Sequence, residues 1–184
     1  MKSITLFFLA CIMLFVASCS NNNSPAPTEA FKTDARAKMI NNIKNEETEM
    51  HKSMQLNNVT ATLAIKAYDD FAKQFPDDSL APDFLFKAGE ITTAIHQYPQ
   101  SLMYYQNITK NYPKYKLYDV SLYLQGFLLD NYLNDDTKAK VIYEEVIAKY
   151  PNSSYANDAR AAITNLGKSD EDLIKEFKKK NGQK

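Results

Sequence analysis

The side chains that could catalyse a reaction or bind a metal are few and scattered along this sequence. The two histidines, His51 and His96, lie far apart and have no metal-ligand spacing around them. No nucleophile elbow, phosphate-binding loop or dinucleotide fingerprint occurs in the chain. The acidic pairs fall at expected helix ends or exposed faces, which favours a solvated role: Asp69-Asp70, Asp77-Asp78, Asp135-Asp136 and Glu144-Glu145. We therefore predict no catalytic residue, no metal site and no cofactor.

Cys19 is the residue for which the sequence predicts a covalent modification. It follows Lys2, an apolar run from Ile4 to Ala17, and Ser18. The run has 14 residues, whereas a helix needs ~20 to span a bilayer. A basic start, a short apolar middle and small residues before a cleavage point are typical of a secretory signal. Residues 1–18 are therefore expected to be removed.

The position of the cysteine directly after Ala17-Ser18 makes the N-terminus resemble a bacterial lipoprotein signal. The resemblance implies that the Cys19 thiol is acylated and that Cys19 becomes the mature N-terminus. Ser20 at the next position is consistent with sorting to the outer membrane, where we expect the protein to face the periplasm. The alternatives are an ordinary signal peptide with a chance cysteine and a retained membrane anchor.

Charge and cysteine content restrict the partners and the stabilising devices of the mature chain. Residues 19–184 contain 21 basic and 22 acidic side chains, a net charge of −1. No large field attracts nucleic acid or an anionic membrane, so nucleic acid is not an expected partner. Cys11 leaves with the signal, and an acylated Cys19 could form no disulfide. Packing must therefore stabilise the fold.

A motif that ends in an aromatic residue and a proline recurs three times, at spacings of 37 and 38 residues. A tyrosine precedes the closing aromatic by seven residues, and a large apolar residue follows that tyrosine by three. These offsets place the side chains on one helical face, and the proline then ends the helix. The copies are Tyr68, Phe71 and Phe75-Pro76; Tyr105, Ile108 and Tyr112-Pro113; and Tyr143, Val146 and Tyr150-Pro151. Such a period is typical of stacked repeats.

The sequence around these motifs predicts helices throughout, since no stretch of useful length alternates with period two. Ser79 is an expected N-cap, Gly167 an expected residue just after a helix, and Ser169 with Asp172 resembles a capping box. We predict an all-α fold, a right-handed stack of helical hairpins. Its expected segments are a signal peptide (1–18), a flexible tether (19–28), an N-terminal helix (29–56), the repeats (57–168), and a C-terminal helix with a basic tail (169–184).

The N-terminal helix, residues 29–56, carries an incomplete apolar seam. The seam consists of Ile40, Ile43, Met50 and Met54, with a gap at Glu47. We expect it to pack the first helix onto the repeat array. The alternative is a short coiled coil that would oligomerise the protein as a structural spacer, with weak self-association as the outcome.

Glycine and proline together give the repeats a family resemblance. Gly89 and Gly126 each lie thirteen residues after a proline, where glycine lets the two helices of a hairpin approach closely. With the motif tyrosines and prolines they resemble tetratricopeptide repeats. Combined with the lipoprotein signal, the chain resembles envelope lipoproteins that act in outer-membrane protein assembly and repeat proteins of the Tol–Pal cell-division system. The resemblance implies an adaptor that contacts other envelope proteins.

The same resemblance indicates a partner-binding surface. In this family the first helix of each hairpin lines the concave side, which implies a set of candidate residues: Asp83, Phe86 and Glu90 in one hairpin, and Tyr123, Phe127, Asp130 and Asn131 in the next. Aromatic rings beside carboxylates suit a peptide or helix with apolar and basic groups. The alternative is that the rings are buried between hairpins. At the last helix end, Lys178-Lys179-Lys180 suits the macrodipole, and a peptidoglycan or membrane contact is the alternative there.

Overall fold

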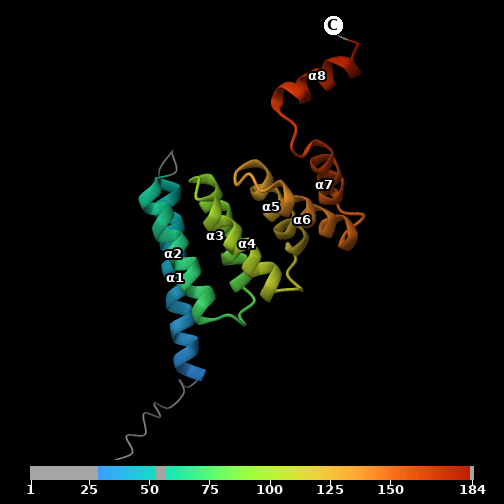
Figure 1. Cartoon of the computed structure of the whole chain (residues 1–184). Coiled ribbons are helices and arrows are strands. Elements are labelled where there is room, and N and C mark those ends of the chain that lie inside the picture. The colour runs from blue at the N-terminus through green and yellow to red at the C-terminus, as the bar shows by residue number, and fades with distance from the viewer. Residues whose placement is uncertain (1–28, 53–56, 183–184) are drawn as a thin grey trace, which may run out of the picture.

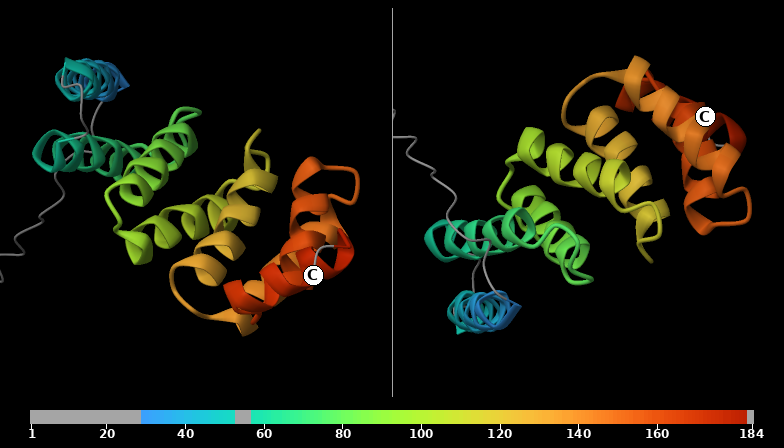
Figure 2. Two further views of the ribbon diagram at one scale, coloured as in Figure 1. Left: turned by 90° about the horizontal axis from the view of Figure 1, so that it is seen from above. Right: turned by 90° about the horizontal axis from the view of Figure 1, so that it is seen from below.

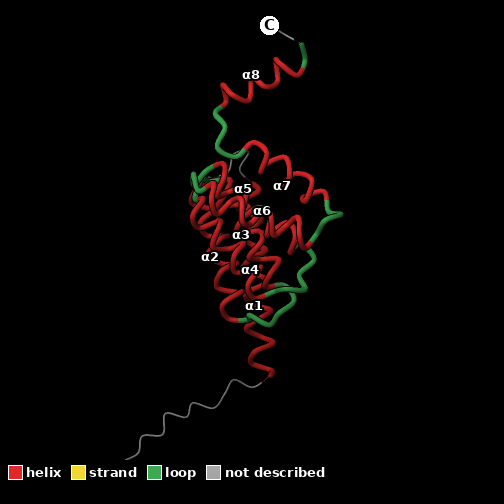
Figure 3. Tube along the Cα trace, turned by 45° about the vertical axis from the view of Figure 1, so that its right-hand side comes forward, coloured by secondary structure: helices red, strands yellow, loops and turns green. Residues whose placement is uncertain are grey.

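The computed structural model describes residues 29–52 and 57–182, so the predicted signal peptide and tether lie outside it. The described residues form eight α-helices and no strand (Figure 3), which confirms the predicted all-α class. In chain order the helices are α1 (Glu29–Lys52), α2 (Asn58–Gln74), α3 (Ala81–Ala94), α4 (Tyr98–Asn111), α5 (Tyr118–Asn131), α6 (Asp136–Lys149), α7 (Ser154–Asn165) and α8 (Asp170–Lys180).

The helices form a stack, as expected for a tetratricopeptide-like α-α superhelix. Each helix from α1 to α6 packs against the next one along the chain, and α5 also contacts α7. Figure 1 shows these pairs as successive layers, and Figure 2 shows the same layers from above and below. The last helix, α8, projects beyond α7 and makes no substantial contact with the other described helices.

The recurring tyrosines lie in the core of the stack. Tyr68 and Tyr105 are each 2% exposed, and Tyr143 is fully buried. The apolar residue three positions later is fully buried in all three copies: Phe71, Ile108 and Val146. These side chains belong to two hydrophobic clusters, one formed by α1–α4 with Leu128 of α5 and the other by α5–α7. Their burial supplies the apolar contact that holds successive hairpins together.

The closing aromatic ends its helix with the same backbone conformation in each copy. Phe75, Tyr112 and Tyr150 have φ between −131° and −126° and ψ between 53° and 63°. Each backbone N–H still donates to the carbonyl of the residue four positions earlier, at 2.8 to 2.9 Å. The following proline excludes the α conformation at this residue, so the helix ends here.

The loop after each proline also repeats its geometry. The second residue after the proline is Asp78, Tyr115 or Ser153, and its N–H donates to the carbonyl of the closing aromatic at 2.9 to 3.1 Å. Its own carbonyl accepts from the N–H three residues later, at 3.0 to 3.1 Å. The loop conformation therefore recurs although the three loop sequences differ.

Two glycines allow the helices of a hairpin to approach closely. A Cβ atom on Gly89 would lie 2.8 Å from the ring of Tyr105 on the next helix. A Cβ atom on Gly126 would lie 2.7 Å from the ring of Tyr143. Real Cβ atoms do not approach other atoms so closely, so these positions of α3 and α5 require a residue without a Cβ.

Local capping follows the sequence at two helix ends and departs from it at a third. Gly167 has φ +73° just after α7, and the Ser169 hydroxyl accepts from the Asp172 N–H at 3.2 Å, which confirms the glycine after α7 and the N-cap half of the capping box. The Asp172 carboxylate accepts from the Ser169 hydroxyl at 2.7 Å. The expected N-cap at Ser79 is wrong. Helix α3 begins after Leu80 without a side-chain cap. The Asp78 carboxylate instead accepts from the Leu80 N–H at 2.9 Å, because Asp78 is the residue that the loop turns inwards.

Helix α1 packs onto the array through its apolar seam. Ile43 is 2% exposed, and Ile40 and Met50 pack against the first cluster. Met54 lies outside the described residues. The expected gap at Glu47 is filled by polar contacts, since its carboxylate accepts hydrogen bonds from the Tyr68 hydroxyl at 2.7 Å and from Lys87 at 2.6 Å. The described part of the seam therefore packs within the chain.

Candidate protein-interaction surface

The seven candidate residues lie on two helices that each open a hairpin. Asp83, Phe86 and Glu90 come from α3, and Tyr123, Phe127, Asp130 and Asn131 come from α5. We call these seven residues the α3/α5 surface. Glu90 and Asn131 are exposed, and the other five are half-buried. Because α4 packs between α3 and α5 along the chain, each set belongs to a different layer of the stack.

Asp83 takes part in a contact between layers. Its Oδ1 accepts a hydrogen bond from the Tyr115 hydroxyl at 2.8 Å and forms an ion pair with Lys116 at 3.0 Å. Burial and the neighbouring Asp83 carboxylate raise the pKa of Tyr115, so its hydroxyl stays a hydrogen-bond donor. Asp83 therefore has partners within the chain, and its role in the α3/α5 surface is to position the loop of the next hairpin.

Phe86 is partly covered by aromatic neighbours. Its ring meets the buried Tyr105 edge-on, with ring centres 5.6 Å apart, and lies 6.4 Å from the ring of Tyr115. Such contacts fix the orientation of the ring while leaving part of its surface open. Phe86 is therefore a rigid apolar element rather than a freely rotating side chain.

An aromatic row runs from α4 to α7 across the second half of the α3/α5 surface. The ring of Tyr123 lies 5.3 Å from Tyr155 and 6.4 Å from Phe127. Phe127 meets Tyr132 edge-on at 5.8 Å. Tyr132 in turn stacks on Tyr98 at 4.0 Å, with an angle of 10° between the rings. The sequence motifs indicated only Tyr123 and Phe127 here, because the other three rings reach the row from helix ends rather than from the repeated positions.

Two carboxylates beside these rings, those of Glu90 and Asp130, form no ion pair within the described part of the chain, residues 29–52 and 57–182. Partial burial raises the pKa of the Glu90 carboxyl, although the nearby Lys87 opposes this. Burial likewise raises the pKa of Asp130. The Tyr143 hydroxyl, which donates a hydrogen bond to the Asp130 carboxylate at 3.2 Å, lowers this pKa by a smaller amount. A cation from outside would relieve this loss of hydration.

Asn131 lies at the exposed end of α5. Its side-chain amide donates to the backbone carbonyl of Phe127 at 3.0 Å, within the same helix. The amide oxygen has no protein partner within the described residues. Asn131 therefore keeps one acceptor towards solvent, next to the aromatic row.

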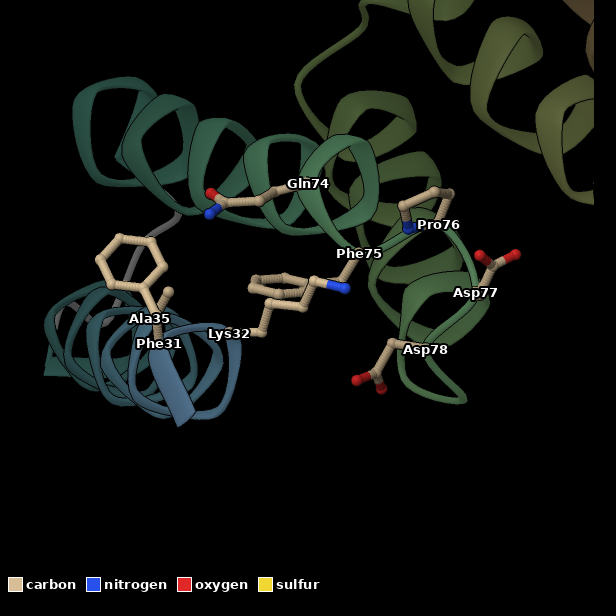
Figure 4. Close-up of a pocket in the computed structure, with 8 residues that line it drawn as sticks. All are labelled: Phe31, Lys32, Ala35, Gln74, Phe75, Pro76, Asp77 and Asp78. Atoms are coloured by element: carbon tan, nitrogen blue, oxygen red, sulfur yellow. The ribbon is translucent and has the colours of Figure 1, made fainter. Parts of the chain in front are cut away.

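Two hollows that the sequence did not predict border the loop from Pro76 to Asp78. One, of about 420 Å³, lies between the start of α1 and this loop (Figure 4), and its lining includes Phe31, Lys32 and Phe75. The other, of about 600 Å³, lies between this loop and the next inter-hairpin loop, and Asp83 and Tyr115 contribute to its lining. The second hollow therefore adjoins the α3 part of the α3/α5 surface.

The described residues give no support to a metal site or a membrane span. Within residues 29–52 and 57–182, no three His, Cys, Asp or Glu side chains gather in a way that could hold a metal ion. Nor does any helix of that part of the chain combine the length and the apolar character needed to cross a bilayer.

Comparison with known proteins identifies one repeat. The family model described as tetratricopeptide repeat matches residues 120–153, which run from α5 through α6 to the loop after Pro151. No curated protein matches the chain. Helical folds built from this repeat are typically non-catalytic scaffolds for protein–protein interaction. Residues 120–153 therefore match one tetratricopeptide repeat, and the other layers of the described stack share its buried tyrosine and its loop geometry.

Proposed function

We propose that this protein is a lipid-anchored scaffold that binds other proteins in the bacterial cell envelope. The observation that carries the proposal is the α3/α5 surface, where fixed aromatic rings lie beside two carboxylates that form no ion pair with a described residue. Protein interfaces are enriched in such aromatic residues, which bury a large area while losing little conformational freedom. A role in outer-membrane protein assembly or envelope maintenance fits the resemblance of the sequence.

The chemistry of the surface indicates the chemistry of its partner. Phe86, Tyr123 and Phe127 offer apolar area, while Glu90 and Asp130 offer negative charge that is already partly desolvated. A peptide or helix with apolar side chains and a lysine or arginine would satisfy both, because the basic group would replace the missing cation. The partner is therefore proposed to be a protein segment rather than a small molecule.

Acylation of Cys19 is proposed to hold the scaffold at the outer membrane, facing the periplasm. The sequence around Cys19 supports this proposal, and the first described helix begins at Glu29, ten positions later. Several acyl chains, at ~0.8 kcal/mol for each buried methylene, would give durable anchoring, whereas one chain would be marginal. The scaffold would then search for partners close to the membrane surface.

The contacts of α1 do not favour the alternative of an oligomeric spacer. Ile40, Ile43 and Met50 of its seam pack within the same chain, and Ile43 is almost fully covered. A coiled coil through residues 29–56 would have to compete with this packing. A peptidoglycan-linked role in cell division shares the scaffold described above and differs only in the partner.

The proposed function is tested by recovering partners from chemically crosslinked envelopes of the native host. The variant Phe86→Ala/Phe127→Ala removes two apolar elements of the α3/α5 surface. Met103→Ala/Val141→Ala is the matched control, since both side chains are exposed on other helices. We expect the first variant to lose defined envelope proteins that the control retains, with equal helical content by circular dichroism. Unchanged recovery by a folded Phe86→Ala/Phe127→Ala protein would refute the proposal.

A further inference from the structure

Helix α8 carries an apolar face that no other described helix covers. Ile174 and Phe177 are 54% and 64% exposed, and Leu173 is half-buried. Offsets of one and four positions place all three on one side of the helix. Neither hydrophobic cluster includes a residue of α8, and the helix projects away from the stack (Figure 1). In a repeat array the second helix of a hairpin normally packs on the first, and α8 does not do so.

Unpaired positive charge borders this face. Lys178, Lys179 and Lys180 form the last turn of α8 and make no ion pair with any described residue. The other lysine of the helix, Lys175, lies 3.9 Å from Asp172. Glu176 is likewise engaged, by Lys168 at 2.7 Å. Although acidic and basic side chains are equal in number along the helix, its C-terminal end is locally basic.

The size of the face argues against a second protein as its occupant. A stable protein interface buries ~800 Å² on each partner, and three apolar side chains on an 11-residue helix cannot supply that area. The boundary between lipid headgroups and acyl chains sets no such threshold. An amphipathic helix binds there when its apolar face enters the boundary and its lysines meet anionic headgroups.

We propose that α8 is a peripheral membrane-binding helix that recognises anionic phospholipid. Leu173, Ile174 and Phe177 enter the headgroup boundary, and the three terminal lysines contact the phosphate groups. This contact lies at the opposite end of the folded chain from the proposed acyl anchor at Cys19. It would hold both ends of the stack near the membrane, and it does not depend on the proposed protein partner.

Vesicle co-sedimentation tests the proposal with residues 19–184 carrying Cys19→Ala, which excludes acylation. This chain keeps the folded unit, because the two hydrophobic clusters and the side chains packed on them lie between Met39 and Leu166. The probes are vesicles of phosphatidylcholine alone and of phosphatidylcholine mixed with phosphatidylglycerol. We expect binding to the mixed vesicles, weaker binding to phosphatidylcholine, and loss of binding at high salt.

Three variants separate the contributions. Ile174→Ser/Phe177→Ser should weaken binding to mixed vesicles by about tenfold or more. Replacement of Lys178, Lys179 and Lys180 by glutamine should weaken it by about tenfold and remove the lipid preference. Met103→Ser/Val141→Ser is the matched control, since these side chains are 67% and 59% exposed in the stack, and it should bind normally.

Two results would overturn the proposal. One is equal sedimentation of the parent chain and the Ile174→Ser/Phe177→Ser variant with mixed vesicles. The other is a dimer in sedimentation velocity that the same variant abolishes, since α8 would then bind a second copy. The assay contains no envelope protein and no acyl chain, so its outcome is independent of the proposed scaffold function.

Discussion

The hydroxyl of Tyr115 donates a hydrogen bond of 2.8 Å to Asp83, a residue 32 positions earlier in the first turn of α3. The same loop position makes the equivalent contact in the other two layers. Asp78 binds Arg36 of α1 through two hydrogen bonds. Ser153 donates to Asp119 of α5 at 3.1 Å. The side chain of the second residue after each motif proline therefore links the start of its own hairpin to the first helix of the preceding hairpin.

Removal of the Tyr115 hydroxyl should weaken this tie without disturbing the core. Tyr115→Phe loses one hydrogen bond to a charged group, so we expect the free energy of unfolding to fall by about 1–2 kcal/mol. Lys116 still pairs with Asp83 in the variant, which limits the loss. Urea unfolding measures the change. Tyr132→Phe is the control, because no described residue bonds its hydroxyl, and an equal loss there would contradict the assignment.

A methyl group at Gly126 should destabilise the hairpin of α5 and α6. Its Cβ would lie 2.7 Å from the ring of the fully buried Tyr143. Overpacking costs ~1–3 kcal/mol, and the better helix propensity of alanine returns ~1 kcal/mol, so Gly126→Ala should lose about 1 kcal/mol net. Thr164→Ala on the exposed surface of α7 is the control and should change stability little. A stabilised Gly126→Ala protein would show that the helices can separate.

The raised pKa of Asp130 predicts a trade between stability and binding. Its folded-state pKa lies above the ordinary aspartate value, so its contribution to stability is full below that value. The contribution is lost as pH rises through the raised folded value. Asp130→Asn has no carboxylate to ionise, so it avoids this loss of stability at neutral pH. The asparagine oxygen can still accept a hydrogen bond from the Tyr143 hydroxyl. The urea midpoint of the variant at neutral pH should therefore exceed that of the parent. Recovery of envelope partners by the Asp130→Asn variant should fall, because the variant lacks the negative charge proposed to bind a basic group of the partner. A lower midpoint would mean that the carboxylate has a stabilising partner.

Metabolic labelling with palmitate in a bacterial host tests the predicted modification of Cys19. The parent chain should be labelled and should fractionate with membranes. Cys19→Ala should lose the label, because the thiol that accepts the lipid is absent. Cys11→Ala is the matched control, since Cys11 lies in the predicted signal and its loss should leave labelling intact. Label on the Cys19→Ala protein would place the modification elsewhere.

Helical periodicity and proline chemistry explain why the fold could be predicted from the sequence. Both depend only on residues that are close in sequence. The shared helical face of Tyr68, Phe71 and Phe75 and the helix end before Pro76 could therefore be predicted from the local sequence. The Ser79 prediction failed because the choice of cap depends on which loop residue turns inwards. That residue is Asp78, and its orientation is fixed by Arg36, 42 positions away.

The candidate site could be predicted only in part, for a similar reason. The repeat register indicates Tyr123 and Phe127, which occupy fixed positions on one helix. Tyr98 and Tyr155 reach the aromatic row from the starts of α4 and α7, and Tyr132 reaches it from the C-terminal end of α5. Their meeting depends on how the layers stack, and the spacing of residues along the chain carries no such information.

The most direct test of the scaffold account is site-specific photocrosslinking in cells of the native host. A benzophenone amino acid placed at Glu90 or Asn131 samples the exposed part of the α3/α5 surface, and the same amino acid at Gln106 or Met103 samples exposed positions of α4. We predict discrete protein adducts from both α3/α5 positions and none from α4. No adduct at Glu90 or Asn131, or the same adducts from all four positions, would contradict the account.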